Sequence, residues 1–581
     1  MTFPPHVLRE YALIADGQRG ALCGPHGDLA WLCVPNWDDD AVLAGLVGGG
    51  GTYSITPTDR FVWGGYYEPG SLIWRNRWTT NHTVVECREA MAFPGDEHRA
   101  VILRRVEAIE GDIRLLVRLD VRAGFGRRAM RHVRRDDDGR WLARSGGLVV
   151  RWSGAADAVP DDDGQLCLEF AVPAGGRHDF VLEIADQPLP DPVDPDFAWT
   201  ATENAWHGAV PTFDDSVAPR DARHACAVLR GLTTHGGGMV AATTLGLPER
   251  AEAGRNYDYR YVWLRDQCYA GIAASVSEAH PLLDDAVRFV TARVLEHGDK
   301  LAPAYRADGS ALPDQTKLDL PDYPGGTAIA GNRATGQFQL DVPGEILQLL
   351  AAAARHDHLD QDGHRAAELA VRLIDERWDR PEAGIWELHD DWWTHSRLEC
   401  VAGLRAFAAQ VPRPRAAELA ILADRILAET ARRCVGPTGA WQRGPDQPGV
   451  DAALLLPPIR GALPAGDPRT VATLDAVGRE LVDDGYVYRF AHHGRQLGDA
   501  EGAFLLCGFT LALAHWQQGR TVEAFRWFER NRAACGPSGL LAEEYDVRQR
   551  QLRGNLPQAF VHALLLETAQ RLAGSPPPGD T

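Results

Sequence analysis

The amino-acid sequence predicts a multi-domain β and α protein, in which an N-terminal antiparallel β-sandwich is followed by a C-terminal (α/α)6 barrel. At 581 residues the chain is too long for one ordinary hydrophobic core, because domains usually divide beyond about 250 to 300 residues. Apolar residues recur with the period of strands over roughly the first 200 residues, and with the period of helices from about Asp221. We therefore expect the sandwich over residues 1–200, a linker over 201–220 and the barrel over 221–573.

Short segments with strand patterning fill the predicted sandwich. Between Ile113 and Val121, apolar residues alternate with Asp and Arg, as in a strand with one buried face. Many short strands separated by Gly, Pro and Asp are typical of a sandwich. A Pro- and Asp-rich stretch from Gln187 to Pro195 ends the pattern. The other strand-like runs span residues 51–57, 71–78, 83–93, 148–152 and 166–172.

Twelve segments with helical periodicity follow. In residues 415–433, for example, Leu419, Leu422 and Ile426 recur at helical spacing between charged residues. Twelve consecutive helices favour six helical hairpins closed into an α/α barrel. The Pro-rich tail, residues 574–581, is expected to be disordered. The twelve segments lie near residues 221–234, 264–278, 281–297, 341–356, 364–378, 398–410, 415–433, 450–460, 468–482, 501–518, 521–534 and 557–573.

The composition excludes several classes of protein. Hydrophobic residues make up 45% and charged residues 24% of the chain, which fits a soluble globular protein and indicates neither disorder nor a membrane span. The formal net charge of −20 would repel nucleic acid and anionic lipid, so neither partner is expected. A neutral substrate fits better. The 17 tryptophans are compatible with stacking on sugar rings, although most buried indoles only fill cores.

The ten cysteines are scattered, without a CxxC motif or a tight cluster. This pattern indicates free thiols in a reducing compartment rather than a disulfide framework or a zinc site. The N-terminus carries no signal-peptide pattern, and we expect a cytoplasmic protein. We predict neither a bound metal nor a cofactor, and the sequence does not indicate an oligomeric state.

Three motifs that look functional have simpler explanations. The run of four glycines at residues 48–51 precedes a strand pattern and lacks the following helix of a phosphate loop, so it is a turn. Residues 235–238 resemble an esterase oxyanion strand, but the chain has no GxSxG nucleophile motif. His492 and His493 have no third spaced ligand and fit a solvated pair better than a metal site.

Two carboxylate-containing segments are more informative. Hydrolysis of a glycoside normally needs one protonated carboxyl group for the leaving oxygen and one ionised carboxylate that activates water or attacks the anomeric carbon. Glu387 lies in the apolar run GIWEL, residues 384–388, where an indole-walled setting would favour the protonated form that a general acid needs. A Glu that caps a helix start looks similar. Glu543 and Glu544 lie in GLLAEEYD, where three carboxylates fall within four residues, as they also do in solvated acidic loops.

A third segment, NYDYRYVWLRD at residues 256–266, combines Tyr259, Trp263, Arg265 and Asp266 just before a predicted helix. An Arg beside an Asp can hold a sugar through paired hydrogen bonds to neighbouring hydroxyl groups. An ordinary salt bridge at a helix start explains the same pair, and both interpretations stay open at this point.

Taken together, these motifs resemble glycoside hydrolase family 15, the family of glucoamylases and bacterial trehalases. The resemblance covers nearly the whole chain, and its motifs occur in family order, which makes them more specific together than singly. They are ALCGPHGDLAWLCVP at residues 21–35, residues 256–266, Gly331-Asn332 through residues 339–341, GIWE at 384–387, EGAFLLC at 501–507 and GNLPQAF at 554–560.

The resemblance implies a β-sandwich, an (α/α)6 barrel and an inverting, exo-acting hydrolysis that releases β-glucose from a non-reducing end. It implies that Glu387 is the general acid and Glu543 the general base, with Glu544 beside it. An inverting mechanism needs room for water between the two carboxyl groups, about 6.5–9.5 Å. The residues implied to bind the terminal glucose or to form a wall of its subsite are Tyr259, Trp263, Arg265, Asp266 and Trp386.

The loop after the implied acid departs from the family pattern. Many bacterial relatives continue with Val-Arg-Gly and a basic, aromatic run that ends in Ser-Lys, whereas LHDDWWTHSR at residues 388–397 is shorter and lacks that Arg. This loop should border the leaving sugar, so its Trp393 is a further candidate for substrate binding. A short α-1,6-linked saccharide such as isomaltose is the first hypothesis for the substrate, with α-1,4 linkages left open.

Three alternatives remain. An α,α-trehalase would use the same fold and the same carboxylates and is the second hypothesis. A phosphate-dependent disaccharide phosphorylase is disfavoured, because the anion of Glu543 would repel phosphate. A carbohydrate-binding protein without activity is disfavoured by the presence of both carboxylates and of the Arg265 and Asp266 pair.

Overall fold

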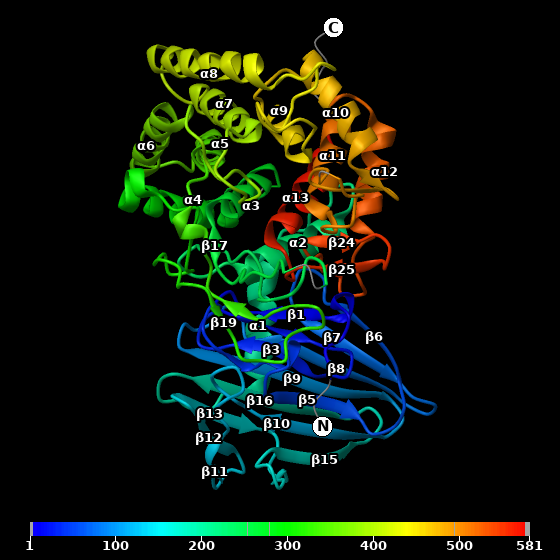
Figure 1. The fold of residues 1–581 in the computed structure, drawn as a ribbon. Helices are drawn as coiled ribbons and strands as arrows, with labels where there is room; N and C mark the ends of the chain where they lie inside the picture. The colour runs from blue at the N-terminus through cyan, green and yellow to red at the C-terminus, as the bar shows by residue number, and fades with distance from the viewer. Residues whose placement is uncertain (1–3, 252–253, 278, 493, 576–581) are drawn as a thin grey trace.

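The structure is a computed structural model that describes residues 4–251, 254–277, 279–492 and 494–575. Figure 1 shows a β-rich half formed by the first third of the chain and a helical half formed by the rest, stacked on each other. This arrangement confirms the predicted fold class.

Three antiparallel sheets make up the β-rich half. The largest consists, in spatial order, of β11 (Arg131–Arg135), β12 (Trp141–Ser145), β13 (Leu148–Ser153), β16 (Arg177–Ala185), β9 (Arg99–Glu110), β8 (Val84–Met91), β7 (Trp74–Thr79) and β6 (Val62–Tyr67). The second consists of β14 (Val159–Pro160), β15 (Leu166–Val172), β10 (Ile113–Asp120) and β5 (Thr52–Pro57). The third consists of β1 (Ala12–Ala15), β2 (Gly20–Cys23), β3 (Leu29–Cys33) and β4 (Ala41–Leu43).

The first two sheets share one hydrophobic core. Ile113, Leu115 and Val117 of β10 are buried, whereas the residues between them are exposed or half-buried, as the period of two predicts. The same core contains Ile102 of β9 and Trp152 of β13. All six predicted strand segments coincide with strands of the sandwich, namely β5, β7, β8, β10, β13 and β15.

The twelve predicted helical segments coincide with twelve helices. The segment expected near residues 450–460 holds a 3-10 helix, Ala452–Leu455, followed by a short α-helix. The helices are α2 (Pro219–Leu232), α3 (Leu264–Val276), α4 (His280–His297), α5 (Asp341–Arg355), α6 (Gln361–Arg377), α7 (Thr394–Ala408), α8 (Arg413–Cys434), α9 (Leu456–Ile459), α10 (Pro468–Glu480), α11 (Leu505–Gln517), α12 (Thr521–Arg532) and α13 (Ala559–Arg571).

One further helix, α1 (Pro195–Ala209), precedes them and overlaps the expected linker, residues 201–220. The Asp194 side chain caps it by accepting a hydrogen bond from the Phe197 N–H, and Pro195 stands at the first helical position. Trp199 and Trp206 are buried from this helix. The connection between the two halves is therefore partly helical and packed.

Alternate helices close into an inner ring. Contacts run from α3 to α5, α7, α9, α11 and α13 and back to α3, while the other helices pack outside this ring. The inner helices are buried on nearly every side, as α5 illustrates from Asp341 to Ala353. The outer helix α8 instead buries one stripe, which includes Leu419, Ala423 and Ile426. A closed ring of six inner helices with outer partners is an (α/α)6 barrel.

The sheet β1–β4 lies between the sandwich and the barrel (Figure 1). The Trp31 indole N–H of β3 donates to the Thr243 carbonyl at 2.8 Å, which fixes a barrel loop on this sheet. Arg260, fully buried, pairs with Asp258 at 2.8 Å and also donates to the Asp39 carbonyl at 2.7 Å. The segment that carries Tyr259 is thus fastened to the β-rich half.

Short strand pairs in the barrel loops lead directly into inner helices. Strand β17 (Val262–Trp263) leads into α3 and pairs with β18 (Ala304–Tyr305), which follows α4. Strand β23 (Ala503–Phe504) leads into α11 and pairs with β24 (Glu544–Asp546), which pairs in turn with β25 (Gln551–Arg553) before α13. The remaining pairs are β19 (Thr316–Lys317) with β20 (Ile329–Ala330), and β21 (Val482–Asp483) with β22 (Tyr486–Val487).

Among the described residues, no helix is both long and apolar enough to cross a membrane. Of the tail that the sequence predicts to be disordered, residues 576–581 lie outside the described part of the chain.

Candidate active site

A pocket of about 230 Å³ lies where several inner helices begin. Its lining comes from the loops that precede α3, α5, α7, α11 and α13, so the N-terminal ends of these helices surround it. Seven of the nine residues predicted from the sequence line this pocket: Tyr259, Trp263, Arg265, Asp266, Trp386, Glu387 and Glu543. The other two, Glu544 and Trp393, do not line it.

The backbone turn that presents Glu387 is strained. Glu387 has a φ of +52°, a left-handed conformation that non-glycine residues adopt rarely because it brings Cβ close to the backbone. Its N–H donates to the Gly384 carbonyl at 3.1 Å. A Cβ on Gly384, which has a φ of +72°, would lie 2.7 Å from Trp393 Cδ1. Trp393 therefore packs beneath the turn and shapes it.

Two donors hold the Glu387 carboxylate. The Trp263 indole N–H donates to Oε1 at 2.6 Å, and Nη2 of Arg265 reaches the same oxygen at 3.4 Å. Nη1 of Arg265 donates to Gln339 at 2.8 Å and contacts Asp341 at 3.3 Å. The Glu387 side chain is 26% exposed, whereas the Arg265 side chain that contacts it is 6% exposed. The Glu387 carboxylate therefore faces the cavity, and the arginine that holds it is buried.

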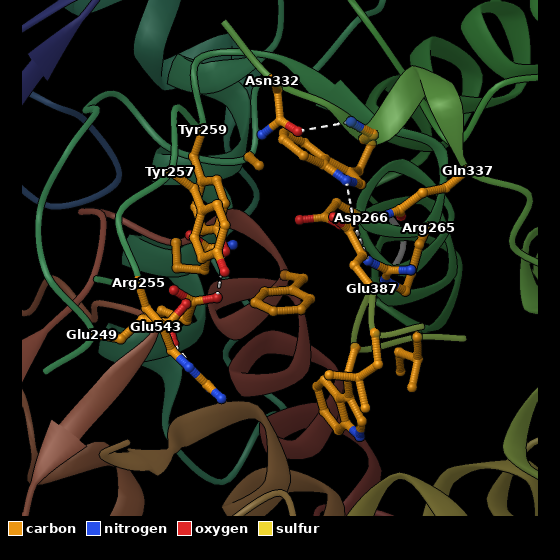
Figure 2. Close-up of a pocket in the computed structure, with 18 of the residues that line it drawn as sticks. Glu249, Arg255, Tyr257, Tyr259, Arg265, Asp266, Asn332, Gln337, Glu387 and Glu543 are labelled. Carbon is orange, nitrogen blue, oxygen red and sulfur yellow. Dashed lines mark hydrogen bonds and ion pairs between the residues drawn. The ribbon is translucent and has the colours of Figure 1, made fainter. Parts of the chain in front are cut away.

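Glu543 enters the pocket from a different side (Figure 2). The Tyr259 hydroxyl donates to its Oε1 at 2.8 Å. Burial raises the pKa of Glu543 well above its ordinary value, and the nearby charge of Glu249 raises it further, whereas the charge of Arg489 and the hydrogen bond from Tyr259 lower it. This carboxylate therefore binds a proton more tightly than an exposed glutamate.

A single short segment holds both glutamates. Tyr259, which donates to Glu543, and Trp263, which donates to Glu387, have ring centroids 5.5 Å apart with planes at 70°. Figure 2 shows Glu387 and Glu543 on two sides of the pocket, with a dashed line between Tyr259 and Glu543. The positions of the two carboxylates are thus fixed against one another by residues four apart in the sequence.

Asp266 lies at the start of α3, beside Arg265. Its pKa is raised to about 7, mainly by burial and also by the charge of Glu387, while Arg265 lowers it. Arg265 and Asp266 both line the pocket, so the pair can present donors and acceptors to adjacent hydroxyl groups.

Trp386 forms an aromatic wall next to Glu387. Its indole N–H donates to Asp451 at 2.9 Å, and its ring meets Phe504 edge to face at 5.2 Å between centroids. These contacts fix the plane of the indole at the pocket.

Several lining residues were not found from the sequence. Glu249, Arg255, Tyr257 and Arg489 lie beside Glu543. Tyr257 lies in the segment 256–266 that the sequence singles out, although it was not named as a candidate, whereas Glu249, Arg255 and Arg489 lie in no motif. The remaining unpredicted polar residues of the lining are Gln315, Asn332, Arg333, Gln337 and Gln558.

Behind Glu543 lies a buried cluster of carboxylates. One oxygen from each of Glu249, Glu501 and Glu544 falls within 4.8 Å of the others, a spacing that could hold a cation. Two arginines already contact this cluster. Arg489 lies 3.6 Å from Glu249 and 3.7 Å from Glu544, and Arg255 contacts Glu501 at 2.6 Å.

The expected pair of solvated histidines is described only in part. His492 Nε2 lies 3.3 Å from Glu501, at the edge of the carboxylate cluster. His493 lies outside the described residues.

Comparison with known families assigns both halves of the chain. Residues 228–570 match the model described as glycosyl hydrolases family 15, and residues 4–185 match the model described as trehalase-like, N-terminal. The first match covers more than half of the chain and contains every residue of the candidate site.

Curated relatives resemble the chain along different lengths. A trehalase of Mycobacterium tuberculosis is 27% identical over 624 residues, which cover 97% of this chain and 89% of that protein. Trehalase 1 of Sulfolobus acidocaldarius is 29% identical over 64% of this chain and 67% of its own length. An isomaltose glucohydrolase of Kribbella flavida is 29% identical over 46% of this chain and 69% of its own length.

Among solved structures, a bacterial glucoamylase complexed with acarbose matches 99% of this chain and 96% of its own, with a TM-score of 0.72 and 13% sequence identity. At that identity the match supports the fold alone. The fold, the family match and the paired glutamates agree, and the chain is a glycoside hydrolase that belongs to glycosyl hydrolase family 15.

Proposed function

We propose that the protein is an inverting, exo-acting α-glucosidase whose preferred substrate is α,α-trehalose. The observation that carries this proposal is the pair of glutamates, Glu387 and Glu543, held at one small pocket by hydrogen bonds from Trp263 and Tyr259. Glycoside hydrolysis needs two such carboxyl groups in different environments.

In this proposal Glu387 protonates the glycosidic oxygen and Glu543 activates the attacking water. Trp263 and Arg265 both reach Oε1 of Glu387, which leaves Oε2 to carry the proton to the leaving group. Glu543 must be ionised to accept a proton from water, and its raised proton affinity makes the ionised form a stronger base. The Asp266 side chain adds an acceptor for the hydroxyl groups of the bound glucose.

The shape of the pocket supports exo-action. Arg265 and Asp266, both buried, line the pocket at the start of α3, next to a barrel interior filled by inner helices. A volume of about 230 Å³ suits a small ligand or the end of a longer one. We therefore propose that the enzyme removes the terminal glucose and does not cleave inside a chain.

Trehalose replaces isomaltose as the first candidate. The preference for an α-1,6 linkage depended on the loop after Glu387 and on the expected cytoplasmic location, and Trp393 of that loop packs beneath the turn at Gly384 instead of lining the pocket. The similarity to trehalases extends over both halves of the chain and supports trehalose. Short α-1,6- or α-1,4-linked glucosides are the second candidate, supported by the similarity to an isomaltose glucohydrolase.

Hydrolysis is favoured over phosphorolysis. Glu249, Glu501 and Glu544 form one carboxylate cluster next to the proposed base, and their negative charges disfavour a phosphate nucleophile there. All ten cysteines are free thiols, eight of them buried, which supports a reducing compartment and hence the proposed cytoplasmic location.

Glucose release from trehalose, isomaltose, maltose and soluble starch tests the substrate. We expect kcat/KM to be highest for trehalose. A higher value for isomaltose would return the α-1,6 hypothesis to first place, and no release from any of the four would refute the α-glucosidase proposal.

Single substitutions test the two roles. Glu387→Gln and Glu543→Gln should each lower kcat on trehalose by about 10²- to 10⁴-fold, the usual contribution of acid or base catalysis. Asp390→Asn is the matched control, because this exposed carboxylate lies three residues after Glu387. α-Glucosyl fluoride separates acid from base, since fluoride departs with little protonation: Glu387→Gln should still hydrolyse it and Glu543→Gln should not. The reverse pattern would exchange the two roles.

A further inference from the structure

Arg489 is a buried arginine between the segments of the two proposed catalytic glutamates. It follows β22, lines the pocket and is only 7% exposed. Its carbonyl accepts a hydrogen bond from the Ala452 N–H at 2.8 Å, directly after Asp451, the acceptor of the Trp386 indole. The backbone of Arg489 is thus held near Glu387, while its side chain extends toward Glu543.

On the side of the base, the guanidinium group contacts three carboxylates. Nε of Arg489 donates to Glu501 at 3.2 Å, and Nη2 donates to the same carboxylate. Nη2 also lies 3.6 Å from Glu249 and 3.7 Å from Glu544. Glu544 is the residue after Glu543 and accepts from the Gly502 N–H at 2.7 Å, so its position is fixed within β24.

On the side of the acid, the same guanidinium group lies over aromatic rings. It is 5.3 Å from the centroid of Trp386 and 5.0 Å from that of Phe504. Trp386 precedes Glu387 directly. A planar arginine can stack and pair at the same time, which a lysine cannot do equally well. Arg489 is therefore a physical link between the turn of Glu387 and the strand that follows Glu543.

The charges around Glu543 give this link a second role. Four carboxylates lie together, Glu543 and the three that Arg489 contacts, and within the described part of the chain Arg255 is the other arginine in contact with them. Tyr257, Tyr259 and Asp266 also face the pocket from the loop before α3 and from α3 itself, Glu387 faces it across the cavity, and His492 contacts Glu501. Without Arg489, the positive charge of one arginine, Arg255, would have to balance four buried carboxylates.

We propose that Arg489 is a positioning residue that holds the turn of Glu387 and the strand after Glu543 together and keeps Glu543 ionised at the working pH. The proposal rests on the acid and base roles given above. A nearby opposite charge shifts a carboxylate pKa by about 1–3 units. Arg489 contacts the neighbours of Glu543 rather than Glu543 itself, so we expect it to lower the pKa of Glu543 by the smaller end of that range, about one pH unit.

The acidic limb of the pH dependence of kcat/KM is the test, because it reports the base of the free enzyme. Arg489→Met should move this limb to higher pH by about one unit, so that kcat/KM on the limb falls about tenfold at a given pH. Arg489→Lys keeps the charge but loses the planar stacking, and should lower kcat while leaving the limb near its wild-type position.

Two further variants keep the test independent of how well Arg489→Met folds. Glu501→Gln removes one carboxylate and should move the limb to lower pH, and Arg489→Met with Glu501→Gln should return it toward the wild-type position. Arg443→Met is the matched control: Arg443 is a neighbouring half-buried arginine that contacts Asp451 at 3.7 Å and does not line the pocket. Its removal should leave the limb in place.

A limb that stays in place in Arg489→Met and Glu501→Gln, with kcat/KM lowered equally at every pH, would show a purely structural role and overturn the proposal. A raised KM with an unmoved limb would assign Arg489 to sugar binding and overturn it as well. These results differ from failure of the proposed function, in which the wild-type protein itself would release no glucose from any α-glucoside tested.

Discussion

Replacing Gly554 by alanine should slow catalysis without changing any reacting group. Gly554 lies in the GNLPQAF motif before α13 and has a φ of +77°. A Cβ at this position would lie 2.9 Å from Oε2 and 3.0 Å from Cβ of Glu543. The added methyl group would therefore clash with the side chain of Glu543, the proposed base.

The size of the effect follows from these distances. Relaxed contacts between carbon atoms begin near 3.5 Å, so Glu543 must retreat by about 0.5 Å. A displacement of about 1 Å at a catalytic group costs about 10²-fold, and half of that displacement about tenfold. We expect kcat for Gly554→Ala to fall about 10- to 100-fold, which corresponds to roughly 1.4–2.7 kcal/mol of activation free energy.

Gly519→Ala is the matched control. Gly519, in the turn between α11 and α12, has a φ of +69°, and a Cβ there would meet no atom within 4 Å. Both alanine variants incur the cost of a left-handed backbone, about 1–2 kcal/mol of stability. Thermal unfolding should therefore show a loss for both, larger for Gly554→Ala because its methyl group also crowds Glu543, and steady-state kinetics should show a fall in kcat for Gly554→Ala alone. If kcat of Gly554→Ala stayed within about threefold of the control, the reasoning on Glu543 would be refuted.

Three further predictions follow from the site and the barrel. Because the pKa of Glu543 is raised and the base must be ionised, activity should be lost as pH falls through a value above the ordinary range of glutamate; an acidic limb near pH 4 in the wild-type kcat/KM profile would contradict this. Tyr259→Phe removes the hydrogen bond that favours the anion of Glu543 and should move that limb to higher pH, whereas Trp263→Phe, which loses a contact to Glu387, should lower kcat and leave the limb in place. Glu567→Gln breaks a buried pair with Arg460 and should cost about 3 kcal/mol of unfolding free energy at pH 7. The pKa of Glu567 is lowered to about 2 by Arg460 and Arg571, below its unfolded value near 4.5, so this loss should shrink as pH falls below 4.5; chemical unfolding at pH 7 and pH 4 measures it, and an equal loss at both would contradict it.

The outer helices and the one-sided strands could be predicted because burial on one face leaves a period in the sequence. The stripe of Leu419 and Ile426 in α8 and the alternation in β10 are such cases. Strand β9 leaves no such period, since its residues from Ala100 to Val106 are buried on both faces. Helix α1 had local signals, Asp194 as N-cap and Pro195 at the first position, which the Pro- and Asp-rich context obscured.

The candidate site divides in the same way. Tyr259, Trp263 and Arg265 could be found together because they lie in one short segment. Glu249 and Arg489 could not, since they lie in no motif and only the closure of the barrel brings them to Glu543, and Glu501 was found only as part of the EGAFLLC motif, without a role. Trp393 illustrates the opposite case: an aromatic residue near the acid suggested sugar binding, but its position is decided by packing against Gly384.

NMR in the first minutes of trehalose hydrolysis shows which anomer of glucose is released and so tests whether the enzyme inverts. Attack of water on the face opposite the leaving group inverts one anomeric centre, while the other glucose departs with its α configuration intact. We expect α- and β-glucose in equal initial amounts from the wild-type enzyme, and release of both at least about 10²-fold slower from Glu387→Gln. Initial α-glucose alone would mean retention, and would contradict the roles of Glu387 and Glu543 as acid and base of a single displacement.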